Sequence, residues 1–406
     1  MPSSTSSSES VGRGGAGGEA MRPGFVRLTA SDRPGIAQPV PERDVPPRPW
    51  PRIFVVAMLV MFTALGAWEW RMRVLGLEPG DLDDGPSAWA EQRRRVDAEN
   101  VQVVLLGDSR MLFDSDLARF AALAGTRPVQ LAIAGSNPRP FLVDLAERTR
   151  FDGLVIVGIA HVSIFGRDAG LGKEALQRHR FESPSLRASF LLHRTLSRRL
   201  AFLDDRHRLS RLVHFVDDDW RVRISTPERL WKLGVMVDDR QTWLWPRVET
   251  DTVFRDHQRA AWNIGPGRKP PPIDETAIAT AQQEVRTAVA MIRARGGEVV
   301  FLRPPSHPDF RLSEEALLPR ARAWDAMLAS AGLVGVHSDD DPVMRRLVPP
   351  EYSHLSRACA TVYTDAYVRA LARLTPRLAL RADAPPPLRA EDCVAAGPMR
   401  AIAERL

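Results

Sequence analysis

The sequence predicts an α/β domain, with helices on both faces of a mainly parallel sheet, behind a disordered tail and one transmembrane helix. Three observations predict this organisation. Short apolar runs rich in β-branched residues alternate with segments of helical periodicity. A single uncharged apolar run, residues 53–68, precedes all of them. Residues 1–51 are rich in Ser, Gly, Pro and Arg and poor in apolar residues.

The amino-terminal segments predict a membrane anchor. Residues 1–51 cannot bury enough apolar surface to offset the entropy of ordering, so we expect a disordered tail. Residues 52–70 are predicted to form the transmembrane helix. The apolar run within it is slightly shorter than the roughly 20 residues of a spanning helix, and aromatic residues typical of membrane interfaces flank it, namely Trp50, Trp68 and Trp70. We expect an uncleaved anchor, because the segment before the apolar run is too long for the n-region of a signal peptide.

The charges around the span predict its orientation. On the amino-terminal side, basic residues outnumber acidic ones and comprise Arg22, Arg27, Arg33, Arg43, Arg48 and Arg52. On the other side, Arg71 and Arg73 are followed by Glu78, Asp81, Asp83 and Asp84. The positive-inside rule therefore predicts a single-pass inner-membrane protein with a cytoplasmic amino terminus and its domain outside, in the periplasm of a Gram-negative cell.

Five apolar runs predict the strands of the sheet: residues 101–106, 129–133, 153–158, 298–302 and 334–337. Helices are expected between a cap at Asp114 or Ser115 and a stop at Gly125, after Asn137, and over residues 275–294, 313–331 and 356–374. The long stretch 163–274 between the third and fourth strands predicts an inserted helical cap over the carboxyl ends of the strands, where ligands bind. The domain then spans residues 100–374, with a linker at 71–99 and a tail at 375–406.

Composition excludes several classes of function. The chain has 56 basic and 50 acidic residues without a dense basic block, so we expect no nucleic-acid partner. There is no Gly-rich phosphate loop and no His/Cys cluster, so we expect neither a cofactor nor a metal. The only two cysteines, Cys359 and Cys393, are able to pair outside the cytoplasm. The favoured alternative is a buried Cys359 and a free Cys393.

The first motif follows the first predicted strand. The sequence GDSRM places Ser109 at a strand-to-helix turn, where a serine hydroxyl is exposed and backbone N–H groups point into the site. A serine needs a base before it acts as a nucleophile. The alternative is that Asp108 or Ser109 only caps a turn.

The second motif precedes the last predicted helix. The sequence PPEYSHLS places Glu351 three residues before His354, and Ser356 is suited to cap the helix that follows. The alternative is a surface loop in which His354 is solvated. The two motifs are more specific together than either is alone.

In this order, the two blocks resemble those of the SGNH (GDSL-type) hydrolases, and the similarity covers about residues 100–162 and 295–374. The resemblance implies a flavodoxin-like three-layer α/β/α fold and acyl-ester chemistry. Ser109 would attack the acyl carbonyl, His354 would accept its proton, and Glu351 would orient the imidazole. The family usually has aspartate at this third position, so three other acids stay open as alternatives: Asp339, Asp340 and Asp341.

The resemblance also implies an oxyanion hole. Its donors would be the N–H of Ser109, the N–H of Gly135 after the second strand, and an asparagine after the third strand, which this chain lacks. Asn137 is a substitute, or else the cap of the next helix. Possible substrate-binding residues are Asp108, Arg110, His161 and Arg303, with a salt bridge to an acidic loop as the alternative for Arg303. His307 is interpreted as a solvated loop residue.

Within that family, the chain looks similar to anchored or periplasmic members found with bacterial exopolysaccharide and cell-envelope genes. We therefore expect an esterase or O-acetyltransferase that acts on an acylated glycan, anchored in the bilayer by residues 53–68. A membrane-bound acyl-transfer or polysaccharide-export partner is also expected. The alternative from another class is a non-catalytic polysaccharide-binding subunit with a degenerate site. The missing asparagine and the Glu-for-Asp exchange favour that alternative, whereas the retained Ser109 and His354 oppose it.

Overall fold

The computed structural model describes residues 46–160, 162–166, 170–209, 212–213, 231–262 and 273–393. Most of the predicted tail lies outside the described residues, and so does His161. The chain divides into two compact units, Met1–Thr63 and Ala64–Leu406. The candidate site belongs entirely to the second unit.

The predicted transmembrane segment lies within α1 (Trp50–Val74). This helix has 25 residues, and its most apolar window has a mean hydropathy of 1.8 and no buried residues. By length and composition it fits a single-pass membrane helix. Past Thr63 the helix continues into the second unit, where Met72 is buried in the core.

Five parallel strands form the main sheet, in the order β2-β1-β3-β6-β7. All five coincide with predicted apolar runs: β1 (Val103–Leu106), β2 (Val129–Gln130), β3 (Leu154–Gly158), β6 (Glu298–Arg303) and β7 (Val334–His337). The order corresponds to 2-1-3-4-5 along the chain, which is the flavodoxin-like arrangement. β2 is shorter than predicted, although Leu131 and Ile133 donate hydrogen bonds to Leu105 and Gly107 and so extend the same pairing.

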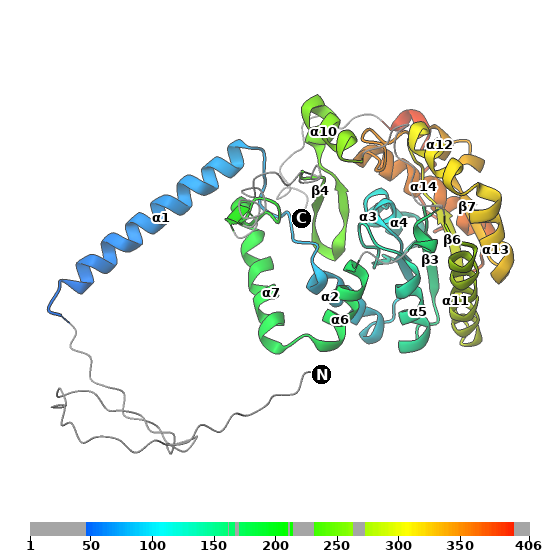
Figure 1. Cartoon of the computed structure of the whole chain (residues 1–406), viewed down its shortest axis with the longest axis horizontal. Coiled ribbons are helices and arrows are strands. Elements are labelled where there is room, and N and C mark those ends of the chain that lie inside the picture. The colour runs from blue at the N-terminus through cyan, green and yellow to red at the C-terminus, as the bar shows by residue number, and fades with distance from the viewer. Residues whose placement is uncertain are drawn as a thin grey trace, which may run out of the picture. The chain divides into compact units, whose positions relative to one another are not determined.

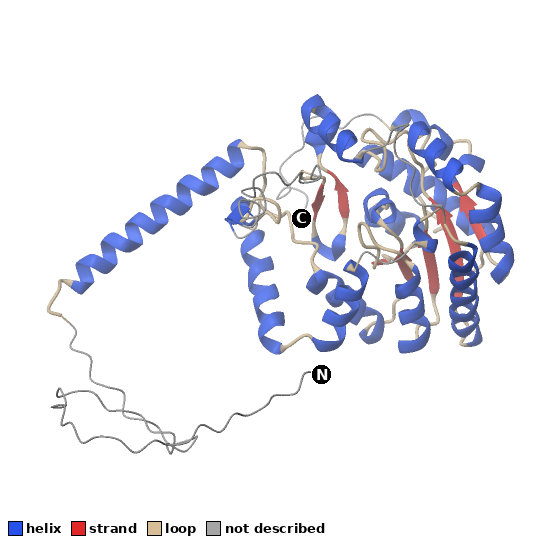
Figure 2. Cartoon of the chain, in the orientation of Figure 1, coloured by secondary structure: helices blue, strands red, loops and turns tan. Residues whose placement is uncertain are grey.

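Helices cover both faces of this sheet (Figures 1 and 2). Alternate residues of each strand point to opposite faces, so the sheet divides the interior into two apolar cores. Leu105 and Ile156 pack on one face with residues of α3 (Ser109–Asp114), α4 (Leu117–Ala124) and α14 (Arg357–Leu374). Val104 and Val155 pack on the other face with residues of α5 (Arg139–Arg148), α11 (Glu275–Ala294) and α13 (Ala326–Ala331).

Two helix predictions need correction. The nucleophile motif itself begins α3, and the cap of α4 is Asp116, whose carboxylate accepts hydrogen bonds from the N–H groups of Ala118 and Arg119. The helix predicted at 313–331 is interrupted. It consists of α12 (Pro308–Leu317), a π-helical turn at Ala321–Asp325, and α13.

The predicted linker at 71–99 is also wrong, because it contains the packed helix α2 (Pro86–Ala98). Trp89 is buried, contacts the Phe141 ring at a centroid distance of 5.2 Å and donates its indole N–H to Leu131 O. Arg93 is buried and pairs with Asp144 of α5. A buried arginine gives no apolar signal in the sequence, so the pattern resembled a solvated segment.

The inserted segment is mixed rather than purely helical. Its described helices are α6 (Leu171–Phe181), α7 (Pro184–Ser197), α9 (Pro246–Thr250) and α10 (Thr252–Trp262). Between α7 and α9 lies an antiparallel pair, β4 (Gly234–Met236) and β5 (Thr242–Leu244). In β4, a Cβ atom on Gly234 would lie 2.5 Å from the Phe113 ring, so this strand packs directly on α3.

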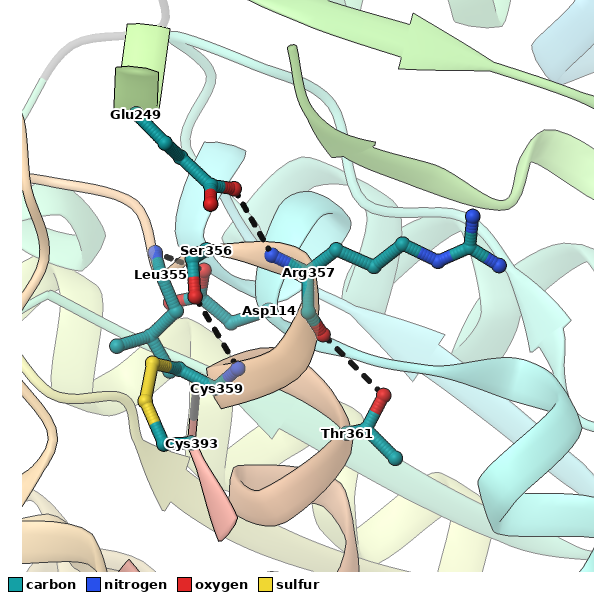
Figure 3. The surroundings of a disulfide bond; sticks show 8 residues. All are labelled: Asp114, Glu249, Leu355, Ser356, Arg357, Cys359, Thr361 and Cys393. Atoms are coloured by element: carbon teal, nitrogen blue, oxygen red, sulfur yellow. Dashed lines mark hydrogen bonds between the residues drawn. A yellow bond between two sulfur atoms is a disulfide. The ribbon is translucent and has the colours of Figure 1, made fainter. Parts of the chain in front are cut away.

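The carboxyl-terminal segment is tied back to the domain. Cys359 in the first turn of α14 forms a disulfide with Cys393, with Cα atoms 4.5 Å apart (Figure 3). The favoured expectation of two unpaired cysteines is therefore corrected. Leu378 is buried, and the Leu388 N–H donates to Asp365, so the described part of the predicted tail packs against α14.

Candidate active site

A cavity of about 740 Å³ lies at the carboxyl ends of the central strands. Ser109, Gly135 and Ala160 line it, and they follow β1, β2 and β3 respectively. β2 lies on one side of β1, and the next strand along the chain, β3, lies on the other side. A crevice is expected at such a reversal of strand order. The inserted segment supplies other walls, including Lys232 and Trp262, so it bounds the cavity.

The sequence GDS places Ser109 in the first turn of α3. A Cβ atom on Gly107 would lie 2.4 Å from Met111 Cβ and 2.9 Å from Gly158 O, so only glycine allows this close approach of helix and strands. Asp108 caps the helix by accepting a hydrogen bond of 3.0 Å from the Arg110 N–H. Ser109 is half-buried and faces the cavity.

His354 and Glu351 form a buried pair. His354 Nδ1 lies 2.8 Å from Glu351 Oε1, and both side chains are fully buried. Tyr352 between them has φ of 80°, a left-handed conformation that is unusual for a bulky residue. This turn brings the same carboxylate oxygen to the N–H groups of Ser353 and His354. The carboxylate therefore fixes both the loop and the ring.

Two aromatic rings lie close to the imidazole. Phe113 of α3 contacts it at a centroid distance of 4.5 Å, and Trp262 of α10 at 5.8 Å. The Trp262 indole N–H also donates to Glu351 Oε2. The inserted segment thus supports the histidine and its acid directly.

Ser109 and His354 line the same cavity but form no hydrogen bond with each other. His354 Nε2 is buried and has no hydrogen-bond partner among the described residues. A buried ring nitrogen without a partner is costly, so this atom is available for a proton from Ser109 or from a ligand. Hydrogen bonds between catalytic groups are often long in structures without substrate.

Three residues of α3 contact three successive residues of the histidine loop, in the same order along the chain. Arg110 Nε donates to Ser353 Oγ at 3.4 Å, the Phe113 ring packs on His354, and Asp114 Oδ1 accepts from the Leu355 N–H at 2.8 Å. Figure 3 shows Asp114 beside Leu355, next to the capped first turn of α14. One short helix therefore carries the candidate nucleophile and also positions the candidate base.

Asp114 is an unusual carboxyl group. It is fully buried, and its Oδ2 atom has no hydrogen-bond partner among the described residues. Burial raises the pKa of Asp114 well above its ordinary value, and nearby Glu351 raises it further, while the Leu355 N–H and Arg110 oppose the shift. The buried Asp114 carboxyl therefore favours its neutral form more than an exposed carboxyl does, and its Oδ1 still holds the loop through the Leu355 N–H.

The predicted oxyanion donors have different surroundings. Gly135 has φ of 70°, which favours glycine, and it lines the cavity. Asn137 also lines the cavity, but its amide donates to Gly166 O at 2.7 Å and its Oδ1 caps α5 by accepting from the Arg139 N–H. Its role as an oxyanion donor would require the bond to Gly166 to open.

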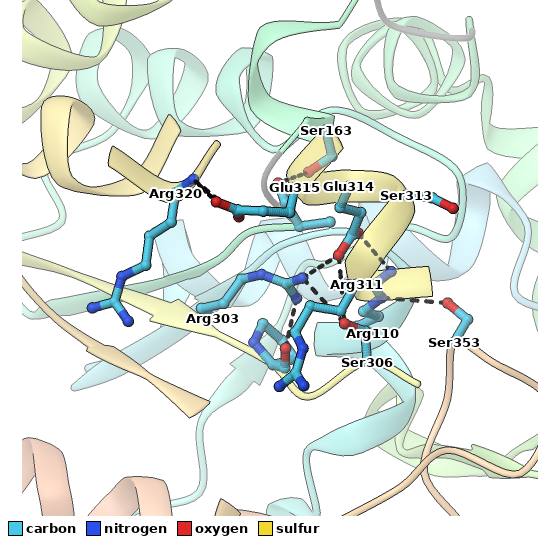
Figure 4. Close-up of polar contacts among 12 residues, drawn as sticks. Arg110, Ser163, Arg303, Ser306, Arg311, Ser313, Glu314, Glu315, Arg320 and Ser353 are labelled. Carbon is cyan, nitrogen blue, oxygen red and sulfur yellow. Dashed lines mark hydrogen bonds and ion pairs between the residues drawn. The ribbon is translucent and has the colours of Figure 1, made fainter. Parts of the chain in front are cut away.

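Arg110 and Arg303 share one buried carboxylate (Figure 4). Glu314 of α12 accepts from Arg110 at 2.8 Å and also pairs with Arg303. Arg110 lines the cavity and stacks over Phe310 at 4.8 Å, whereas Arg303 does not line it. The structure thus does not bring Arg303 to the cavity, because the Glu314 carboxylate holds its guanidinium group behind the cavity wall.

A second polar cluster lies in the cavity wall formed by the inserted segment. Lys232 Nζ pairs with both Asp81 and Asp204, and all three side chains line the cavity. Burial raises the pKa of Asp81 to about 6, and the charge of Lys232 opposes this shift only in part. The cavity therefore has this polar cluster in its wall in addition to Ser109 and His354, and apolar residues such as Leu171 and Met236 line it as well.

The three alternative acids and His307 have contacts other than with His354. Asp339 and Asp340 pair with Arg311 and Arg320, and Asp341 caps the turn at Val343 and Met344. Glu351 is therefore the acid that contacts the imidazole. His307 caps α12 and packs against Tyr352. Sequence reasoning missed Phe113, Asp114 and Trp262, because no local motif marks a residue that acts through tertiary contacts.

Comparisons with known proteins do not assign the chain to a family. No protein-family model matches it, and a search of curated proteins found no match. The interpretation of the site therefore depends on its own residues and their geometry.

Proposed function

We propose that the chain is a serine-dependent acyl-ester hydrolase or O-acyltransferase of the SGNH type. One observation carries the proposal. In the buried His354–Glu351 pair, Nε2 has no hydrogen-bond partner among the described residues, and it lies in the wall of a cavity that Ser109, at the start of α3, also lines. Nucleophile, base and orienting acid are the three roles that acyl transfer through a serine requires.

In the proposed reaction, Ser109 Oγ attacks the acyl carbonyl as His354 Nε2 accepts the hydroxyl proton. Glu351 holds Nδ1 and stabilises the imidazolium that forms. The N–H groups of Ser109 and Gly135 face the negative oxygen of the tetrahedral intermediate. The intermediate collapses to an acyl-serine as the imidazolium returns its proton to the leaving alcohol. A water or sugar hydroxyl then attacks the acyl-serine by the same steps in reverse order.

The cavity supports a substrate larger than a simple ester. Its volume of about 740 Å³ is in the range of ligand sites and has space for one or two sugar rings. Aspartates and arginines in its walls are suited to hydroxyl groups, and the partly exposed Trp262 and Phe310 offer aromatic surfaces. We propose an acylated envelope polysaccharide as substrate, with acetyl as the acyl group and either water or a sugar hydroxyl as acceptor.

The proposed location is the outer side of the inner membrane, with α1 as a single anchor and the amino terminus in the cytoplasm. The arginines before the span support this orientation. The Cys359–Cys393 disulfide also supports it, because disulfides persist mainly in oxidising compartments. A membrane-bound acyl donor or a polysaccharide-export complex would be the partner at this location.

A serine-reactive fluorophosphonate tests the proposal on the full-length chain in detergent. We expect the wild type to be labelled and Ser109→Ala to be unlabelled. Ser163→Ala is the matched control, because Ser163 also lines the cavity but only donates to Ala160 O, and this variant should keep its label. Equal labelling of the wild type and Ser109→Ala would contradict the proposal.

A second candidate is a polysaccharide-binding subunit without turnover. The observations that favour it are the lack of a Ser109–His354 hydrogen bond and the engagement of the Asn137 amide by Gly166. Under this candidate, the wild type would bind glycan in a pull-down assay yet resist fluorophosphonate and leave acetyl esters intact. This candidate would be established if Ser109→Ala bound glycan as well as the wild type does and if neither protein reacted with fluorophosphonate or acetyl esters.

A further inference from the structure

The inserted segment exposes one apolar face of α7. Ala188, Leu192 and Leu196 are four residues apart and therefore lie along one stripe of the helix. They are exposed, Leu192 to 62 %, and Leu191 beside them is exposed as well. On the opposite side, Phe190 packs against the small core cluster of Leu82, Ala88 and Met236. The helix therefore uses its less apolar side for packing and turns leucines outward.

This face is fixed rather than a frayed end. Arg194 of α7 forms an ion pair with Glu91 of α2, and Ser197 O accepts from the Gly80 N–H at 2.9 Å. Ser183 caps the first turn by accepting from the Leu186 N–H. The middle and the carboxyl end of the helix are thus tied to other elements of the domain, and the first turn is capped, so the leucine stripe is a fixed surface of the domain.

The carboxyl end of α7 meets the end of α1. Glu69 accepts hydrogen bonds from the N–H groups of Ala201 and Phe202 at 3.1 and 3.0 Å, and Arg73 donates to Arg199 O at 3.4 Å. These contacts lie within the second unit. The uncharged run of α1 ends at Trp68, one residue before Glu69. The boundary of a bilayer spanned by α1 therefore lies within about one helical turn of the chain that leaves α7.

Cations accompany the leucines. Arg71, Arg187 and Arg199 are exposed and have no ion-pair partner within the described parts of the chain. Exposed leucines with arginines beside them are typical of helices that lie in the interface of an anionic membrane. A protein partner would explain the exposed leucines, but it would not explain why they lie on a helix whose end contacts the end of α1.

We propose that the exposed face of α7 lies on the surface of an anionic lipid bilayer, beside the point where α1 leaves it. Leu192 and Leu196 enter the boundary between headgroups and acyl chains, and Arg187 and Arg199 contact lipid phosphates. The domain is then held by two membrane contacts. The second contact fixes the tilt of the domain, and with it the direction in which the cavity opens.

The test uses the full-length protein reconstituted into vesicles of phosphatidylcholine and phosphatidylglycerol. An environment-sensitive dye is attached to Leu192→Cys or, as a control, to Met291→Cys. Met291 is exposed on α11, which lies on the side of the domain away from α7 (Figure 1). The native cysteines form a disulfide and do not compete for the dye under oxidising conditions. Nitroxide-labelled lipids then quench any dye that lies in the interface.

We expect a blue-shifted emission and several-fold stronger lipid quenching at position 192 than at position 291. Adding Arg187→Gln and Arg199→Gln should reduce quenching at position 192. Equal, weak quenching at both positions would overturn the proposal. Protection of position 192 that appears only after a second protein is added would also overturn it, in favour of a protein interface. Protein that fails to reconstitute at all would instead contradict the anchor itself.

Discussion

Asp114 provides a test of how the candidate base is positioned. Its Oδ1 atom accepts the Leu355 N–H at 2.8 Å, directly beside His354, in a fully buried environment. Replacement by valine removes the acceptor and leaves a buried N–H group unpaired, which costs about 1–3 kcal/mol. Replacement by asparagine keeps an acceptor at nearly the same place and is neutral. The two variants therefore separate the hydrogen bond from the charge.

We expect Asp114→Val to lower the free energy of unfolding in urea by about 1–3 kcal/mol. It should also lower kcat more than it raises KM for an acetyl ester, because the loop that carries His354 loses a constraint while the cavity keeps its shape. Asp114→Asn should retain most of the stability and most of the activity of the wild type. Faster hydrogen exchange at the Leu355 amide in the valine variant would report the loosened loop independently of activity.

The raised pKa of Asp114 determines how the stability of the fold should change with pH. Because the pKa of Asp114 is raised in the folded protein, its neutral form stabilises the fold at low pH, and this contribution is lost as pH rises through the folded pKa. Asp114→Asn cannot ionise, so it should lose less stability than the wild type as the pH rises above the ordinary pKa of a carboxyl group. Identical profiles of stability against pH for the two proteins, or a valine variant with wild-type kcat and stability, would refute this reasoning.

Three other predictions concern the acid beside His354, the disulfide and the membrane topology. Glu351→Gln should lower ester turnover, but by less than His354→Ala, since an orienting group contributes less than the base itself. Cys359→Ser should lower the free energy of unfolding by about 3–4 kcal/mol, because it opens a loop with a sequence separation of 34; an unchanged urea midpoint would show that the disulfide does not form. A periplasm-active reporter fused after Leu406 should be active, and activity of a cytoplasmic reporter there would reverse the proposed topology.

The sheet and the place of the candidate site were predictable because their signals are local. The strands coincide with short runs of mainly apolar residues, and parallel topology then places the residues after β1, β2 and β3 at one edge. The loop before α14 was predictable for a similar reason, since Glu351 and Ser356 have short-range roles around His354. These features follow from periodicity, capping and connection rules without knowledge of distant contacts.

Other features depend on contacts between distant segments. Arg93 looks solvated in the sequence, but it is buried because Asp144 pairs with it. Arg303 looked available for a ligand, but Glu314 from the next helix neutralises it. Trp262 gave no signal, because its role comes from the packing of α10 on the histidine loop. Pair formation across a fold has no period in the sequence, so only the structure reveals it.

The central claim is that Ser109 and His354 act as one catalytic unit. The most direct measurement is turnover of a small acetyl ester by the full-length wild type, Ser109→Ala, His354→Ala and the double variant. Each single substitution should abolish turnover, and the double variant should be no slower than either, because effects within one catalytic unit are not additive. Wild-type turnover by Ser109→Ala, or two partial losses that multiply in the double variant, would contradict the claim.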